Sequence, residues 1–305
     1  MSPAPDATPK TVALKAREDK PGLAVGICLL VFLCFAGIDT SAKWLLEAGH
    51  PVGQVVFVRY LAALIIIVAI FAPSQGSRLW RMRRPTLTLV RGAMLVFATA
   101  ANFFALQYLP LTVTTSIFYI SPLVVTVLAA LFLQEAIGPR RIAAIAIGFA
   151  GVLIITRPWG ADFHWAMLVS LIPPIAASVY NVLTRKLAGV EAPDTMQFWA
   201  AILPVIFIAP FAFTGWKWPA MGWDLFFFSA IGFFGWLGHQ LFVLAHRYAD
   251  ASTLAPVTYI HIIYMAAASW LIFHHPPEVW TIAGAAVIVV SGVYVWMRER
   301  AAKGH

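Results

Sequence analysis

Several ionisable side chains lie within long apolar stretches of this chain, where a charge is costly unless protein or water surrounds it. Asp39 and Lys43 are four residues apart, so a helix would place them on one face within ion-pair reach. They could hold the amino and carboxylate ends of a zwitterion, or neutralise each other with Lys43 snorkelling toward water. Arg59 is predicted to pair with Asp39 as part of the scaffold, whereas Arg91, near a predicted helix end, is expected to snorkel.

A histidine and two tyrosines occupy related positions in a distant internal repeat. Tyr119 and Tyr259 are 140 residues apart, and the same offset relates Ser121 to His261. His261 falls near the middle of an apolar stretch and can titrate near neutral pH. We expect it either to be satisfied structurally or to contact a substrate together with the two tyrosines.

Prolines interrupt both copies of this repeated segment. Pro122 follows Tyr119 closely, and Pro256 precedes Tyr259. A proline in a membrane helix frees a backbone carbonyl, which is tolerated only where protein or a water-filled cavity satisfies it. The two prolines therefore predict helix breaks that line and gate a path.

A glycine stripe runs through the stretch Gly232-Phe-Phe-Gly-Trp-Leu-Gly-His-Gln. Small residues at this spacing allow close helix packing in a membrane. The same stripe could instead form the wall of a pocket at Gly235 and Gly238, with Trp236 and His239 beside it. Both interpretations stay open at the level of sequence.

Two asparagines in apolar stretches need hydrogen-bond partners, because an unpaired amide is costly in hydrocarbon. Asn102 and Asn181 are expected either to join helices or to contact a substrate, and Phe103 follows the first of them. A pocket lined by Phe103, Trp236 and the repeated tyrosines would suit a flat apolar substrate. It would also hold an organic cation by cation–π attraction.

Composition predicts that these residues are positioned by membrane-spanning helices. The chain is 61% hydrophobic and 11% charged, whereas a soluble chain carries roughly a quarter charged residues. The apolar stretches predict ten spans of membrane length. The predicted spans are 22–46, 51–72, 86–107, 111–134, 139–156, 163–187, 195–214, 222–245, 251–274 and 277–297.

Basic residues predict the orientation of these spans. Sixteen Lys and Arg residues fall in tails and connections on one predicted side, and only Arg157 and Lys217 fall on the other. Since basic segments stay in the cytoplasm, both termini are predicted to be cytoplasmic. The predicted divisions are a disordered tail 1–21, five-helix repeats 22–157 and 158–297, and a second tail 298–305. An odd number of spans per repeat requires the second repeat to be inverted.

The sequence offers little to an enzyme. It has no phosphate-binding loop Gly-x-x-x-x-Gly-Lys-Ser/Thr, no His-Glu-x-x-His and no Gly-x-Ser-x-Gly. The adjacent His274 and His275 would diverge and are not expected to bind a metal. No cofactor and no nucleic-acid partner is expected, because the orientation of the spans explains the basic charge.

Several residues in order and spacing resemble the drug/metabolite transporter superfamily, EamA type. They are Lys43, Arg59, Tyr108-Leu-Pro-Leu-Thr, Ser121-Pro-Leu and Glu135. The resemblance extends from about residue 22 to residue 297, and length and aromatic content look most like the YddG-type exporters of aromatic amino acids. The second half departs from the pattern, since His275 stands at the position that matches Glu135.

The expected fold is an all-α polytopic membrane protein with ten transmembrane helices, arranged as two inverted repeats around a central cavity. The resemblance implies a bacterial inner-membrane transporter that exports small amphipathic metabolites, aromatic amino acids first, and acts as a monomer. The alternative is an exporter of hydrophobic organic cations driven by proton antiport. A membrane scaffold or a polytopic enzyme is disfavoured.

Overall fold

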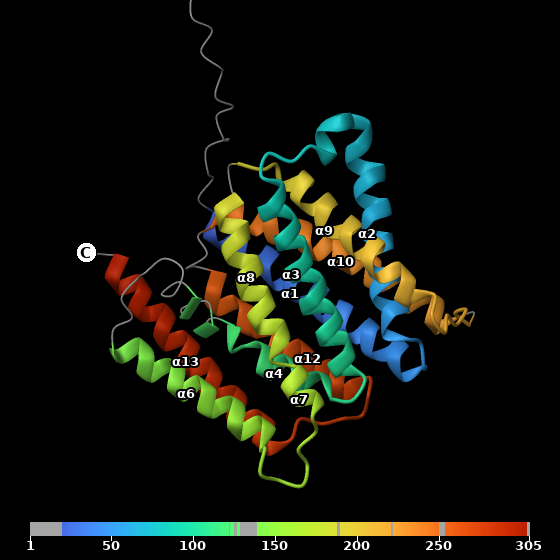
Figure 1. Cartoon of the computed structure of the whole chain (residues 1–305). Helices are drawn as coiled ribbons and strands as arrows, with labels where there is room; N and C mark the ends of the chain where they lie inside the picture. The colour runs from blue at the N-terminus through green and yellow to red at the C-terminus, as the bar shows by residue number, and fades with distance from the viewer. Residues whose placement is uncertain are drawn as a thin grey trace, which may run out of the picture.

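The computed structural model describes residues 20–121, 123–124, 127–128, 139–187, 190–220, 222–249 and 254–303. Regular structure within these residues is entirely helical (Figure 1). Two short 3-10 helices span Gly76–Trp80 and Ala255–Tyr259. The α-helices are α1 Pro21–Glu47, α2 Val52–Gln75, α3 Pro85–Leu106, α4 Leu111–Phe118, α6 Pro139–Thr156, α7 Ala166–Val169, α8 Ile172–Leu187, α9 Pro193–Ala212, α10 Trp223–Tyr248, α12 Ile260–Leu271 and α13 Val279–Lys303.

Proline and glycine set many of the helix ends. Proline is the first residue of α1, α3, α6 and α9, where its missing N–H costs no helical hydrogen bond. Pro51 and Pro110 stand immediately before α2 and α4. Gly49 and Gly76 follow α1 and α2 with φ of +84° and +52°, a conformation that other residues rarely adopt.

Six helical stretches are long and apolar enough to cross a membrane: Gly22–Glu47, Val52–Trp80, Pro85–Leu106, Ala166–Thr184, Pro193–Ala212 and Trp223–Phe242. Three shorter apolar helices are Ile142–Thr156, Val257–Leu271 and Val279–Tyr294. These nine stretches coincide with nine of the ten predicted spans. The tenth predicted span, 111–134, begins as α4, and much of its second part lies outside the described residues.

Two predicted spans are less regular than expected. The span 163–187 is divided into α7 and α8, because Pro173 and Pro174 have no N–H to continue the hydrogen bonds of α7. The span 251–274 begins as a 3-10 helix at Ala255 and becomes α12 at Ile260. It ends before His274, whose φ of +55° is incompatible with a continuing helix.

Large apolar side chains cover the outside of the helix bundle. Phe97, Phe207, Phe211, Ile263 and Trp270 are each more than 60% exposed. A soluble monomer rarely exposes so many large apolar side chains to this extent. These side chains therefore face lipid, and the chain is a multi-pass membrane protein.

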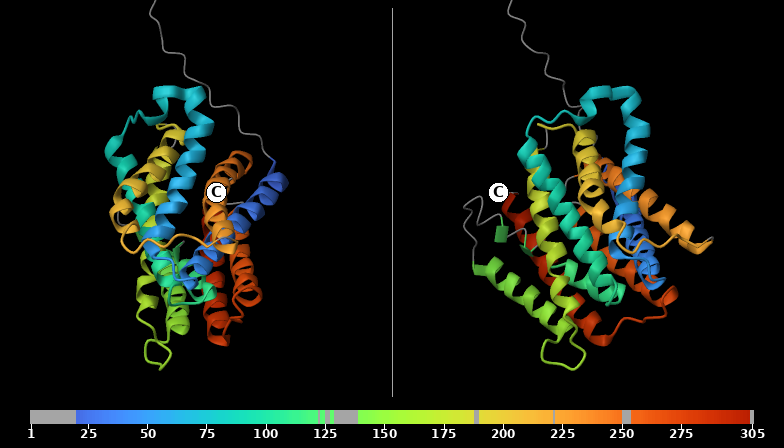
Figure 2. Two further views of the ribbon diagram at one scale, coloured as in Figure 1. Left: turned by 90° about the vertical axis from the view of Figure 1, so that its right-hand side faces the viewer. Right: turned by 45° about the vertical axis from the view of Figure 1, so that its right-hand side comes forward.

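The helices of the two halves of the chain interleave. In each of the closest helix pairs, α1–α10, α2–α9, α3–α8 and α6–α13, one helix comes from the first half and the other from the second (Figure 1). The pair α6–α13 lies at one edge of the bundle, where both helices remain adjacent when the view is turned (Figure 2). Neither half is a separate body.

Connections predicted to lie on the same side of the membrane contact each other. The Glu191 carboxylate between α8 and α9 accepts hydrogen bonds from the backbone N–H groups of Arg83 and Arg84, before α3. Arg157 after α6 forms a 3.1 Å ion pair with Glu278 before α13. The alternation of sides along the chain thus agrees with the predicted order of spans.

Candidate functional site

A small cavity lies between α2, α3, α9 and α10, and so between both halves of the chain. Its volume of about 30 Å³ has room for a water molecule or two. Small residues of α2, α9 and α10 leave the space open. The lining includes Arg59, Tyr60, Ala63, Leu95, Gln197, Ala200, Ala201, Gly235, Trp236 and His239.

Arg59 is the one cation among the residues that line this cavity, and it is buried. Its Nη1 donates to Thr99 Oγ1 at 2.6 Å and to the Tyr60 hydroxyl at 3.3 Å. The guanidinium carbon lies 4.8 Å from the Tyr60 ring centroid and 5.7 Å from that of Phe103. Phe103 is therefore part of the support beneath Arg59.

The expected Asp39–Arg59 ion pair is wrong. Asp39 instead accepts a 3.0 Å hydrogen bond from Asn102 Nδ2, which joins α1 to α3. No ion pair of the described residues connects Asp39 to Arg59 or to Lys43. The reason is that Asn102 reaches Asp39 from a third helix, which the hairpin-based prediction did not include.

Lys43 is directed toward the end of α3. Its Nζ donates to the carbonyls of Leu106 and Leu109, at 2.9 and 3.2 Å, and lies 3.1 Å from the Glu47 carboxylate. The side chain is only 6% exposed. A cation at a helix C-terminus satisfies carbonyls that have no intrahelical partner. In this structure Lys43 caps a helix, and it is absent from the cavity lining.

Lys43→Met is expected to lower the stability of the protein while leaving substrate selectivity unchanged. The substitution removes two hydrogen bonds from a buried charged donor and leaves two carbonyls without a partner, at a cost of about 2–3 kcal/mol. The thermal melting of the purified variant in detergent, compared with Lys186→Met on the exposed surface of α8, measures the effect. A changed substrate ranking would instead place Lys43 at the substrate.

The glycine stripe of α10 serves two purposes. A Cβ at Gly232 would overlap the Cβ of Ala62, and one at Gly238 would come within 2.8 Å of the Phe35 ring. A Cβ at Gly235 would lie 3.7 Å from Arg59 Nε, an ordinary contact distance. Gly232 and Gly238 thus permit close packing against α2 and α1, whereas Gly235 belongs to the cavity wall.

The repeated tyrosines form a second group, where α4 meets α12. The Tyr119 and Tyr259 ring centroids are 5.2 Å apart, and the Tyr119 hydroxyl donates to the Thr258 carbonyl at 2.6 Å. The His261 ring lies 6.3 Å from Tyr119 and 5.7 Å from Phe32. His261 Nε2 is buried without a hydrogen-bond partner.

This aromatic group is separate from the cavity but joined to it by ring contacts. Phe32 lies 5.7 Å from Phe35, and Phe35 lies 5.3 Å from His239 at the cavity. The predicted single pocket of Tyr119, Tyr259, Trp236 and Phe103 is therefore two sites linked through α1. Trp236 Nε1, at the cavity, is also buried without a partner.

The remaining predicted residues lie elsewhere. The Asn181 side chain is exposed on α8 and has no hydrogen bond among the described residues. Pro256 stands in the 3-10 helix that precedes α12, so an irregular segment does occur there. Pro122 lies outside the described residues.

Arg91 is a polar centre that the sequence interpretation missed. It is 4% exposed, and its guanidinium donates to Thr184 Oγ1 at 2.7 Å, the Met196 carbonyl at 3.1 Å and the Tyr180 hydroxyl at 2.6 Å. It also lies 4.3 Å from the Tyr180 ring centroid. The expectation that Arg91 snorkels is wrong, because α8 and α9 supply partners that bury it.

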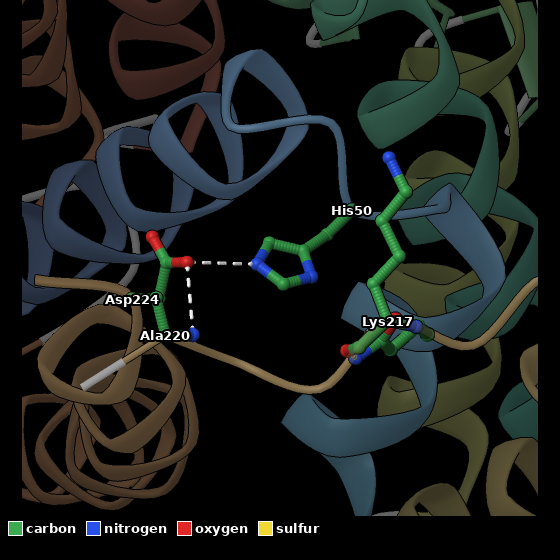
Figure 3. A network of polar contacts seen from close by, with 5 residues as sticks. His50, Lys217, Ala220 and Asp224 are labelled. Carbon is green, nitrogen blue, oxygen red and sulfur yellow. Dashed lines mark hydrogen bonds and ion pairs between the residues drawn. The ribbon is translucent and has the colours of Figure 1, made fainter.

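A further polar network holds the connection between α9 and α10 against the turn between α1 and α2 (Figure 3). His50 Nε2 lies 3.2 Å from Asp224 Oδ2, which also accepts from the Ala220 N–H at 3.3 Å. The Gln54 amide donates to the Lys217 carbonyl at 2.6 Å and accepts from the Lys217 N–H at 3.1 Å. Both halves of the chain are thus joined here.

Comparison with known proteins agrees with this arrangement of helices. The EamA-like transporter family matches the chain twice, over residues 22–157 and 164–297. A solved crystal structure has the same fold, with a TM-score of 0.61 at 18% identity over 92% of this chain and 97% of its own. This family match, together with the nine apolar helical stretches of the described residues, identifies a membrane transporter rather than an enzyme. The chain belongs to the EamA-like transporter family.

Relatives in this family differ in their named substrates. The chain is 27% identical to an S-adenosylmethionine uptake transporter of Rickettsia bellii, over 92% of this chain and 95% of the relative. It is 28% identical to a riboflavin transporter of Vibrio cholerae, over 88% and 90%. It is 27% identical to the pseudopaline exporter CntI of Pseudomonas aeruginosa, over 80% and 86%. The names include both uptake and export.

Proposed function

We propose that the protein is a secondary or facilitative carrier that exports small amphipathic metabolites, aromatic amino acids first, through the cavity at Arg59. The observation that carries this proposal is the lining itself, in which one buried guanidinium stands among the rings of Tyr60, Trp236 and His239. Aromatic faces suit a flat substrate ring. A free volume of about 30 Å³ cannot hold a whole amino acid, so the helices around the cavity must move for transport.

We also propose that the two halves are inverted repeats with boundaries at 22–157 and 158–297. Gly92 of α3 and Gly232 of α10 are 140 residues apart, and each packs closely on a helix of the other half. A Cβ at Gly92 would lie 2.7 Å from Leu203 of α9, and one at Gly232 would overlap Ala62 of α2. Equivalent residues in equivalent contacts support a two-fold relation between the halves.

The α6–α13 crossing supports the same relation. Gly151 of α6 meets Gly284 of α13, with a built Cβ at Gly151 only 2.9 Å from the Gly284 carbonyl. The repeat offset of 140 residues relates Gly151 to Ser291 and Gly284 to Ala144. The Ser291 hydroxyl donates to the Ala144 carbonyl at 2.5 Å. The neighbouring rings of Tyr119 and Tyr259 are 5.2 Å apart and belong to equivalent residues, as expected beside a two-fold axis.

The proposed location is a bacterial inner membrane, with both termini cytoplasmic and a monomer as the working unit. The excess of Lys and Arg on one side of the spans supports this orientation. The aromatic cavity is formed within one chain, so transport does not require a second copy.

S-adenosylmethionine is the second candidate substrate. Relatives of this name match at 26–27% identity over most of the chain. An adenine ring would use the same aromatic faces as an indole or a phenyl ring. A hydrophobic organic cation is the third candidate and would require proton antiport.

Saturable uptake of tryptophan or phenylalanine into proteoliposomes is expected, at least about tenfold above empty vesicles and without a pH gradient. The reason is that a stacking site needs no coupling ion to bind a ring. Labelled tryptophan, phenylalanine, alanine, S-adenosylmethionine and riboflavin are compared, with and without a pH gradient. If neither tryptophan, phenylalanine nor alanine is transported, the aromatic amino-acid proposal is overturned. Transport of S-adenosylmethionine alone would favour the second candidate.

A further inference from the structure

We propose that Arg59 selects substrates that carry a carboxylate, by donating from its Nε and Nη2 atoms to the two carboxylate oxygens. This inference rests on the proposed function, since it concerns the same cavity. It names the chemical group that a substrate must present, an α-amino carboxylate next to a flat ring, and it excludes organic cations that lack an acid.

The hydrogen bonds of Arg59 leave one edge of the guanidinium available. Nη1 is occupied by Thr99 and Tyr60, while Nε and Nη2 have no hydrogen-bond partner among the described residues. Neither nitrogen is fully buried, so each keeps accessible surface at the cavity. The Nε–Nη2 edge has the spacing that binds a carboxylate through two parallel hydrogen bonds.

Gly235 keeps this edge uncovered. A Cβ at Gly235 would lie 3.7 Å from Arg59 Nε and 3.9 Å from its Cγ. Any longer side chain at this position would extend over the guanidinium. The absence of a side chain on α10 opposite Arg59 is therefore what gives a ligand access to the charge.

The charge of Arg59 also lacks an acidic partner within ion-pair distance in the described part of the chain. Asp39 is engaged by Asn102, and the residues that line the cavity include no Asp or Glu. Asp39 still acts on Arg59 through space, but from beyond ion-pair distance, so the cost of burying the guanidinium is only partly compensated. An anionic substrate group would relieve this cost, whereas a cationic substrate would add to it.

The surroundings suit the rest of such a substrate. Gln197 of α9 lines the cavity and carries an amide oxygen that can accept from an ammonium group. Trp236 offers both a ring face and an Nε1–H that is buried without a partner. The ring of such a substrate would enter only as the surrounding helices separate, because the free volume beside Arg59 is about 30 Å³.

Two ligand pairs that differ only in the carboxylate test this inference. They are tryptophan with tryptamine, and S-adenosylmethionine with its decarboxylated form. Apparent affinities are obtained from the concentration dependence of the melting temperature of purified protein. We expect the acid of at least one pair to bind about tenfold or more tightly than its amine, as two charge-assisted hydrogen bonds would give.

Three variants connect the preference to Arg59. Arg59→Gln is expected to bind acid and amine equally, through loss of acid binding. Arg59→Lys keeps the charge but not the paired donors, so an intermediate preference for the acid is expected. This variant also provides the test if Arg59→Gln does not fold. Arg157→Gln makes the same replacement at an ion pair outside the cavity lining and should keep the full preference.

Each failure has its own signature. Equal binding of acid and amine by the unmodified protein would overturn the inference and leave the ring-binding carrier in place. A preference that survives in both Arg59 variants would also overturn it. Binding of no member of either pair would overturn the proposed function, and the inference with it.

Discussion

Leucine in place of Gly151 is expected to cause the largest loss of folded protein. A Cβ at Gly151 would lie 2.9 Å from the carbonyl oxygen of Gly284, and a Cβ at Gly284 would lie 2.6 Å from that of Gly151. Backbone atoms cannot rotate aside as a side chain can, so α6 and α13 would have to separate. We expect a destabilisation of at least about 3 kcal/mol, the upper part of the range for overpacking.

The melting temperature of Gly151→Leu, measured in detergent after size-exclusion chromatography, should fall by roughly 6–12 °C. Gly26→Leu is the matched control, because Gly26 is also a membrane-helix glycine but has no atom within 4 Å of a built Cβ. The control is expected to melt within about 2 °C of the unmodified protein. Equal melting of the two variants would show that the α6–α13 crossing tolerates a side chain.

Sequence alone was sufficient for the positions of the helices. Apolar length predicts a span wherever the chain must satisfy its backbone groups without water, so nine described stretches fall where they were expected. Departures occur at proline. Pro173 and Pro174 divide one span that hydropathy predicts as continuous, whereas the 3-10 helix around Pro256 is an irregularity that the proline itself predicts. A window of hydropathy does not register the missing N–H groups.

The composition of the cavity was predicted only in part. Gly235, Trp236 and His239 line the cavity, as the pocket-wall interpretation of the glycine stripe predicts. Tyr119 and Tyr259 lie in a separate group. Counting residues along a span gives the depth of a side chain. It does not give the direction in which that side chain points. Helices that are apolar on every side carry no polarity pattern from which to read the inward face.

Arg91 shows a second limit of sequence reasoning. Its position near the start of α3 favours snorkelling, because nearby water is the simplest partner for a charge. The structure supplies Tyr180, Thr184 and Met196 instead, from helices about 90 or more residues later in the chain. The interleaving of the two halves brings these partners together, and nothing local in the sequence indicates it.

Replacement of Arg91 by methionine is therefore expected to weaken the packing of α3 against α8 and α9. The substitution removes three hydrogen bonds and the contact over the Tyr180 ring, and leaves the Tyr180 hydroxyl without its donor. Loss of a buried charged donor costs about 3 kcal/mol, so the melting temperature should fall by roughly 6–12 °C. Transport per folded molecule would fall as well, since α3 and α9 both enclose the cavity.

Thr88→Val provides the control for this prediction. Thr88 is buried one turn from Arg91 on the same helix, but its hydroxyl has no hydrogen-bond partner. Valine of similar shape should therefore keep or slightly raise the melting temperature. Arg91→Lys retains the charge without the planar fork and should fall between the two. If Arg91→Met melts like the unmodified protein, the prediction is wrong. The hydrogen bonds of the guanidinium would then be replaced by bonds to water, as expected for a snorkelling arginine.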